Sequence, residues 1–181
     1  MISLGILLIL AWQFYIGYRR GLGLQGLYLL GSLVSLFVAS LHYRSLGEWL
    51  YLWVPYASAT EGASTYFFDQ SQLFDLDQVF YAGLGFFIIY MVTYTVVRFL
   101  GLFVHLADLD SLDVGYTRIV SGILSVLVTW IGIEMVLTIM ATVPIGLVQD
   151  KLHESLMVRL MIDTPLVSSF LKNLWVVKIL G

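Results

Sequence analysis

Glu134 is the residue of this sequence whose type and position suggest chemistry most directly, since no other charged residue occurs from 119 to 149. A charge at the centre of a membrane helix costs about 2.5 to 3.5 kcal/mol, so an acid there is a candidate for proton or ion transfer. However, Glu134 lies 16 residues after Arg118, about 24 Å along a helix. This distance favours an acid at the far membrane surface or one paired for structure, with Lys151 or Arg159 as its partner.

Small residues recur at every fourth position in two apolar stretches, and these stripes are candidates for helix packing. They are Gly31, Ser35 and Ala39 in the first stretch, and Ser121, Ser125 and Thr129 in the second. Lipid gives helices no hydrophobic reason to associate, so close contact along small residues and serine hydrogen bonds usually holds them together. We therefore expect these two spans to contact each other within the chain. An oligomer interface or the lining of a narrow pore is the alternative.

The remaining polar groups predict no metal site, no cofactor and no catalytic residue. His105, Asp108, Asp110 and Asp113 share a polar connection, where aspartates are typical of solubility and helix capping, and no second histidine-rich element supports them. The sequence contains no cysteine, which removes thiolate nucleophiles and cysteine zinc sites. It also contains no glycine-rich phosphate loop, HExxH or GxSxG motif. We therefore expect a protein that is not an enzyme.

The composition is that of a protein whose surface faces lipid. Of its 181 residues, 60% are hydrophobic and 12% are charged, about half the charge expected of a soluble domain. The net charge of −3 provides no basic surface for nucleic acid, so we expect no nucleic acid partner. The sequence predicts an all-α integral membrane protein with a single membrane domain, residues 1–181.

Long stretches with little or no charge predict four transmembrane helices at about 2–18, 21–41, 78–98 and 117–141. A span needs about 20 residues to cross a hydrocarbon layer of about 30 Å. The first two spans are joined by Gly17, Arg19, Arg20 and Gly21 around one tyrosine, a link short enough to require a tight antiparallel hairpin with arginines at the headgroups. The positive-inside tendency places this turn in the cytoplasm and the N-terminus outside, although basic residues also occur on the other side.

Three amphipathic segments predict helices at the membrane surface, at about 45–54, 149–162 and 165–179. The first begins with a capping-box spacing, Ser45 to Glu48, and is rich in tryptophan and tyrosine, which favour the headgroup layer. The last begins with Thr164 and Pro165, an N-cap followed by proline at the first helical position. The two tail helices either lie at the interface or pack on the bundle.

Three groups of residues resemble the colicin V production protein (CvpA) family, in its Gram-positive form. The first is Gly17-Tyr18-Arg19-Arg20-Gly21-Leu22 with Gln25, the second is Thr117-Arg118-Ile119-Val120-Ser121-Gly122, and the third is Val143-Pro144, Gln149, Ser155 and Thr164-Pro165-Leu166. The resemblance covers nearly the whole chain. The sequence departs from the family pattern at Ser3, Leu24 and Ser121, where many members have an acid, a basic residue and a glycine.

The resemblance implies the bacterial cytoplasmic (inner) membrane and an association with toxin production, toxin export and envelope maintenance. The leading hypothesis is a non-enzymatic scaffold that assists such a process. Its partners would be the lipid bilayer and either a second copy of itself or other membrane proteins. The alternative is a small oligomeric transporter or channel that uses Glu134.

Overall fold

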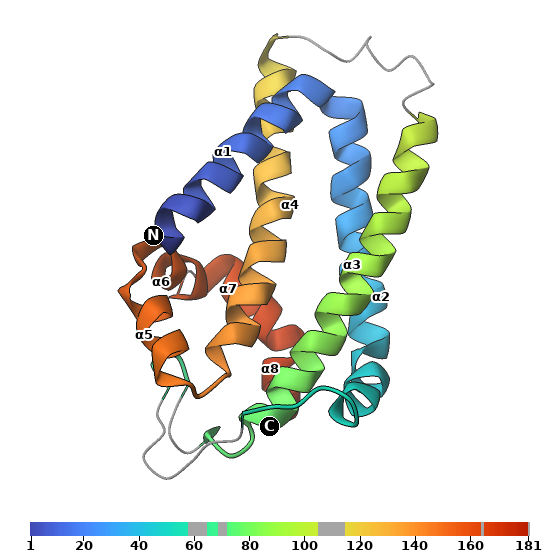
Figure 1. Cartoon of the computed structure of the whole chain (residues 1–181). Helices are drawn as coiled ribbons and strands as arrows, with labels where there is room; N and C mark the ends of the chain where they lie inside the picture. Colours follow the sequence, from blue (N-terminus) through green and yellow to red (C-terminus); the bar gives the residue numbers. More distant parts are fainter. Residues whose placement is uncertain (58–64, 69–71, 105–114, 164, 181) are drawn as a thin grey trace.

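The structure, a computed structural model, describes the chain except residues 58–64, 69–71, 105–114, 164 and 181. Its longest helices are α1 (Ile2–Arg20), α2 (Leu22–Tyr51), α3 (Leu76–Val104) and α4 (Gly115–Ala141) (Figure 1). Each contains an 18-residue window with mean hydropathy between 1.4 and 2.2, long and apolar enough to cross a membrane. The predicted all-α membrane fold with four spanning helices is confirmed.

The four long helices form two pairs, in which α1 packs along α4 and α2 packs along α3. One residue, Gly21, separates α1 from α2, and its φ of 85° lies in the left-handed region that glycine adopts most easily. The predicted turn is therefore tight, but α1 and α2 diverge from it, as Figure 1 shows, and contact each other little along their length. The tight turn is therefore present, but the two helices do not lie side by side as an antiparallel hairpin, because each packs mainly on another partner.

Glycines bring α2 and α3 into close contact along most of their length. A Cβ atom added to Gly85 would lie 2.7 Å from the carbonyl oxygen of Tyr43, and one added to Gly47 would lie 3.0 Å from that of Tyr81. Near the other end, a Cβ atom on Gly101 would lie 2.6 Å from the ring of Tyr28. These contacts leave no room for a side chain, so the pair depends on backbone approach, as in other membrane helix pairs.

The predicted surface helix at 45–54 is instead the last part of α2, which continues to Tyr51. No proline interrupts the chain before Pro55, and Gly47 packs against α3 without leaving the helix. Ser45 and Glu48 therefore lie inside a helix and do not form a capping box. Their spacing of three residues also occurs within any helix, so it did not mark a helix start here.

The tail forms four short helices, where the sequence predicts two. They are α5 (Gly146–Glu154), α6 (Leu156–Asp163), α7 (Pro165–Leu174) and α8 (Val176–Leu180). The predicted helix at 149–162 breaks at Ser155, which is extended with a ψ of 112°, and the one at 165–179 breaks at Trp175. These short helices allow the chain to bend around the bundle beneath α1 and α4 (Figure 1).

The tail packs on the bundle, which decides between the two predicted arrangements. Val158, Met161 and Ile162 of α6 are buried with Ile6 and Leu10 of α1 in one apolar cluster. In a second cluster, Leu171, Trp175 and Val176 are buried against α2, α3 and α4. The ring of Trp175 lies 4.9 Å from that of Phe86, measured between centroids. The tail is therefore part of the core at this end of the molecule.

Candidate functional site

Glu134 is fully buried, with 0% of its surface exposed, so its side chain does not face lipid. The indole nitrogen of Trp130 donates a hydrogen bond to one carboxyl oxygen at 3.0 Å. Among the described residues, the other oxygen has no hydrogen-bond partner. This arrangement is that of a carboxyl group enclosed by protein rather than one that faces the bilayer.

Lys172 of α7 is the cation that interacts electrostatically with Glu134. Burial lowers the pKa of Lys172, while the negative charges of Asp163 and Glu134 act in the opposite direction. Its ammonium group donates a hydrogen bond to the carbonyl oxygen of Ile162 at 3.2 Å. The predicted partners, at positions 151 and 159, are both exposed. The sequence suggested these two residues because they are the Lys and Arg residues that follow Glu134 most closely along the chain. It gave no sign that α7 folds back onto α4.

The glycine of the predicted hairpin and the serine stripe of α4 lie together in the structure. The Ser121 hydroxyl is within hydrogen-bond distance of two carbonyl oxygens at the turn, 2.5 Å from that of Gly17 and 2.9 Å from that of Gly21. A Cβ atom added to Gly17 would overlap Ser125 and lie 2.7 Å from the Ser121 carbonyl oxygen. Two sets that the sequence singles out separately therefore form one contact between α1 and α4.

The α2 stripe lies against α3, although the predicted contact between the second and fourth spans is also present. A Cβ atom on Gly31 would meet Val97 of α3, the Ser35 hydroxyl donates within its own helix to the Gly31 carbonyl at 2.7 Å, and Ala39 is buried in the α2–α3 core. The helices α2 and α4 do contact each other, but each stripe packs against another helix. The Thr129 hydroxyl donates to the Ser125 carbonyl at 2.9 Å, also within one helix.

The residues of the tail motif occupy junctions between elements. Pro144 lies in the non-helical link between α4 and α5, and Pro165 begins α7 as predicted. The Ser155 hydroxyl is hydrogen-bonded to the Ser3 hydroxyl at 2.8 Å, which ties the tail to the start of α1. Thr164 lies outside the described residues, as do the candidate metal ligands His105, Asp108, Asp110 and Asp113.

A cavity of about 490 Å³ lies between the α1–α4 pair and the α2–α3 pair. Small-molecule sites usually occupy about 300 to 1,000 Å³. All four long helices contribute polar side chains to its wall: Gln13, Arg20, Gln25, Tyr90, Tyr94, Thr95, Arg98, Ser125 and Thr129. Glu134 does not line this cavity. The divergence of α1 and α2 from their turn therefore leaves an open space between the two helix pairs, with both polar and apolar side chains in its wall.

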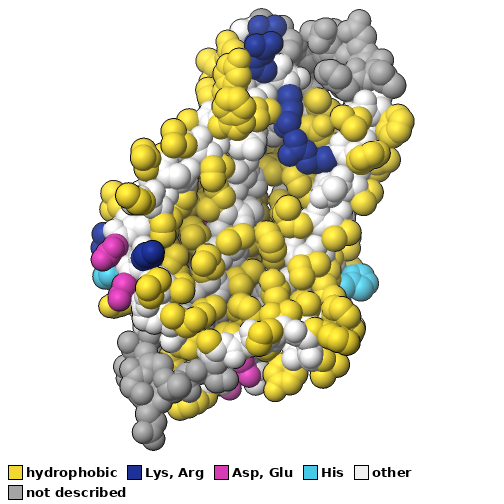
Figure 2. Space-filling view, viewed as in Figure 1, with side chains coloured by type: hydrophobic (Ala, Val, Ile, Leu, Met, Phe, Trp, Pro, Cys, Tyr) yellow, Lys and Arg dark blue, Asp and Glu magenta, His cyan; other side chains and the backbone are white. Residues whose placement is uncertain are grey.

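Two arginines in this wall share one aromatic ring. The guanidinium carbon of Arg20 lies 5.2 Å from the ring centre of Tyr28, and that of Arg98 lies 5.3 Å from it. Arg98 also lies 5.9 Å from the ring centre of Tyr94. The rings attract both cations, but the cations repel each other, and no described carboxylate lies within ion-pair distance of either. Figure 2 shows Lys and Arg side chains gathered at this end of the molecule.

Gln25 adds a buried polar group that lacks a partner. The side chain lines the cavity with 1% of its surface exposed. Its carbonyl oxygen has no hydrogen-bond partner among the described residues, and such an unpaired buried group costs about 1 to 3 kcal/mol. The sequence does not predict this site, because a neutral side chain within a span lacks the cost that marks a charged one. The available signal was two glutamines, Gln13 and Gln25, on either side of the first turn.

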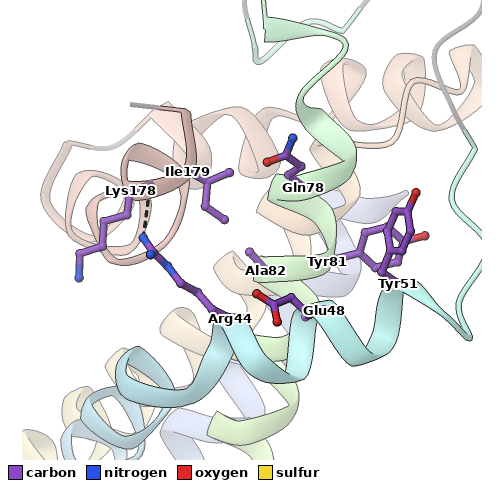
Figure 3. A pocket seen from close by; sticks show the side chains of 9 residues that line it. Arg44, Glu48, Tyr51, Gln78, Tyr81, Ala82, Lys178 and Ile179 are labelled. Atoms are coloured by element: carbon purple, nitrogen blue, oxygen red, sulfur yellow. Dashed lines mark hydrogen bonds between the residues drawn. The ribbon is translucent and has the colours of Figure 1, made fainter.

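A second cavity, of about 480 Å³, lies where the end of α2, the start of α3 and α8 meet (Figure 3). Its charged side chains are Arg44, Glu48 and Lys178, and all three are exposed. The guanidinium of Arg44 donates to the carbonyl oxygen of Lys178 at 3.2 Å, the dashed line in Figure 3. This cavity holds charges of both signs at an open edge, so it shows neither the unbalanced charge nor the buried unpaired group of the first cavity.

Two comparisons with known proteins found matches over most of the chain. The sequence profile described as colicin V production protein matches residues 2–165. The chain is also 22% identical over 176 residues to the uncharacterized transmembrane protein YshB of Bacillus subtilis (strain 168), covering 97% of each protein. No solved structure matches this chain. With four membrane-spanning helices and a match to the family profile over most of its length, the chain belongs to the colicin V production protein family.

Proposed function

We propose that this protein is a non-enzymatic component of the bacterial cytoplasmic membrane that assists toxin production or export and envelope maintenance, and that the cavity between the two helix pairs is its working site. The nature of the cavity wall is the main support. Guanidinium, amide and hydroxyl groups line it, without Asp, Glu, His or Lys among the residues that form it. Such groups bind and orient a ligand, whereas acid–base or nucleophilic catalysis requires groups that gain and lose protons near neutral pH.

The outer surface of the helices supports a scaffold role. Large apolar side chains such as Trp12, Leu33, Phe37 and Phe99 are exposed on three different helices. Lipid, a second copy of the chain or another membrane protein would cover them. The end of the bundle with Arg19, Arg20, Arg98 and Arg118 would face the cytoplasm, which places the N-terminus outside.

Toxin export from living cells tests this proposal. A strain that lacks its own copy of the gene is supplied with the wild-type chain or with the double variant Arg20→Gln/Arg98→Gln, and colicin V released into the medium is measured by growth inhibition. We expect the double variant to lose most of the release restored by the wild type. Arg19→Gln is the matched control, because Arg19 is exposed and does not line the cavity.

Equal release by the double variant and the control, at equal amounts of protein in the membrane, would refute the cavity as the working site. The double variant is first shown to be folded by its helical circular dichroism and its thermal midpoint in detergent. This step separates loss of the cavity charges from loss of the protein.

The alternative is a small oligomeric transporter, and the cavity is the specific observation that favours it. Glu134, the residue that the sequence suggested for transport, is enclosed between Trp130 and the tail and does not line the cavity. A transport pathway would therefore use the cavity instead. Solute or proton flux into liposomes that disappears in Glu134→Gln would support transport through Glu134, and flux that disappears in Arg20→Gln/Arg98→Gln would support transport through the cavity.

A further inference from the structure

We propose that the cavity binds a phosphate monoester with an apolar tail, the phosphate lying between Arg20 and Arg98 and the tail lying against α3 and α4. This ligand class belongs to the site proposed above and rests on that proposed function. Its support is the charge, the unpaired amide and the apolar wall of the cavity.

The charge of the cavity favours an anionic ligand. Arg20 and Arg98 are both partly buried, and their guanidinium carbons lie 5.2 and 5.3 Å from the centre of the same ring, that of Tyr28. The two positive charges are therefore neighbours. Two partly buried like charges beside one ring, with no described acid next to them, repel each other unless an anion neutralises them. A bound anion would turn this repulsion into two charge-assisted interactions.

The shape and charge of a phosphate monoester fit two guanidiniums better than a carboxylate does. A carboxylate presents its two oxygens to one guanidinium fork, whereas a tetrahedral phosphate presents oxygens in several directions and can accept from two forks. A phosphate monoester also carries a charge of about −1.5 to −2 at neutral pH, which balances the two arginines. Tyr94, whose ring lies 5.9 Å from Arg98, helps to hold that guanidinium in place.

Gln25 indicates that the ligand also has a hydrogen-bond donor. Its side-chain carbonyl oxygen is buried and has no partner among the described residues. A hydroxyl group near the phosphate, as in a glycerol ester, would satisfy it. This second observation is independent of the arginines, because the Gln25 side chain is neutral.

The rest of the cavity wall is apolar and suits a hydrocarbon tail. Phe87 and Met91 of α3 face it from one side, and Val128, Ile133 and Val136 of α4 from the other. The cavity volume of about 490 Å³ corresponds to about 16 waters at about 30 Å³ each, which is more than a phosphate group alone requires. An apolar tail would fill the remainder and exclude water from it.

Calorimetric titration of the purified full chain in an uncharged detergent tests the assignment. The probes are dihexanoyl phosphatidic acid, hexanoyl lysophosphatidic acid, dihexanoyl phosphatidylcholine and glycerol 3-phosphate. Lysophosphatidic acid has one tail and a free glycerol hydroxyl, and glycerol 3-phosphate has the phosphate and hydroxyls without a tail. We expect phosphatidic acid to bind more tightly than phosphatidylcholine or glycerol 3-phosphate, and lysophosphatidic acid, which can also donate to Gln25, to bind most tightly. Each of Arg20→Gln and Arg98→Gln should weaken it by about tenfold or more, because each removes one charged hydrogen-bonding group.

Control variants keep the test interpretable. Arg19→Gln removes the same charge outside the cavity and should bind phosphatidic acid as the wild type does. Arg20→Lys keeps the charge but not the fork, and it should bind more weakly than the wild type and more tightly than Arg20→Gln. This variant remains informative if Arg20→Gln does not fold.

Several outcomes would overturn the proposal. Equal binding of phosphatidic acid and phosphatidylcholine, or unchanged affinity in both cavity variants, would overturn the phosphate site. Equal affinity for glycerol 3-phosphate would overturn the tail and identify a soluble phosphate ester as the ligand. If the lipid does not bind but the double variant still abolishes toxin release, the ligand is wrong and the proposed function stands. If the lipid binds but the double variant releases toxin normally, the ligand stands and the proposed function is wrong.

Discussion

Replacing Gly17 with alanine should separate α1 from α4 at their closest approach. The added Cβ atom would overlap Ser125 and lie 2.7 Å from the carbonyl oxygen of Ser121 and 3.1 Å from Cα of Gly122. Two of these three neighbours are backbone atoms, which cannot move aside by changing a rotamer. The helices must therefore shift apart, and the shift would lengthen the hydrogen bonds from the Ser121 hydroxyl to the turn.

The expected cost follows from these contacts. Overpacking of a well-packed site costs about 1 to 3 kcal/mol, and an interhelical hydrogen bond in a membrane protein contributes about 0.6 kcal/mol on average. Alanine regains up to about 1 kcal/mol of helix propensity relative to glycine. The net loss in the free energy of unfolding should therefore be about 1 to 3 kcal/mol.

Gly5→Ala is the matched control, because Gly5 lies in the same helix and has no atom within 4 Å of the added Cβ position. It should be neutral or slightly stabilising. The measurement is unfolding of each purified variant in mixed micelles with rising SDS, followed by circular dichroism. If Gly17→Ala is no less stable than Gly5→Ala, the close contact between α1 and α4 does not exist as described.

Two further predictions concern the opposite end of the molecule. The Tyr56 hydroxyl donates to the carbonyl oxygen of Thr142 at 2.6 Å, and burial is the main cause that raises the pKa of Tyr56 to about 12. The stabilisation of the fold by the neutral Tyr56 hydroxyl is therefore complete below about pH 10, where the unfolded phenol ionises, and is lost as the pH rises through 12. Tyr56→Phe should reduce the fall in thermal midpoint between pH 9 and 11.5. An unchanged fall would refute this prediction. Trp175→Ala removes a side chain that is 1% exposed and packs on Phe86, so the free energy of unfolding should fall by about 3 to 5 kcal/mol. The loosened tail should be cleaved faster by trypsin at Lys178. Unchanged cleavage would contradict the packing.

The spanning helices could be predicted from the sequence because hydrocarbon imposes a length and an apolar composition on each of them. Their ends could not. The spacing of Ser45 and Glu48 is the same within a helix as at its start, and α2 continues past them because Gly47 packs on α3. The breaks at Ser155 and Trp175 depend on how the tail bends over α1 and α3, which local sequence does not determine.

The cavity could not be predicted because it depends on which helices pair. The small-residue stripes correctly predict that α2 and α4 contact each other, but they do not predict that Gly31 lies against α3 and Ser121 against α1. That pairing pulls α1 and α2 apart and leaves polar groups from all four helices around one space. A charge within a span, such as Glu134, indicates a possible site because of its cost, whereas a neutral side chain such as Gln25 gives no such signal.

The cavity between the helix pairs is the feature on which the proposed function depends most, and cysteine labelling tests it directly because the natural chain contains no cysteine. Thr129 lines the cavity, while Leu127, two residues away on the same helix, is 43% exposed on the outside, where lipid lies. In membrane vesicles, a charged methanethiosulfonate reagent should modify Thr129→Cys quickly and Leu127→Cys slowly, and dihexanoyl phosphatidic acid should slow the first reaction. If both cysteines react equally slowly with the reagent, the cavity does not exist as described and the proposed site is wrong.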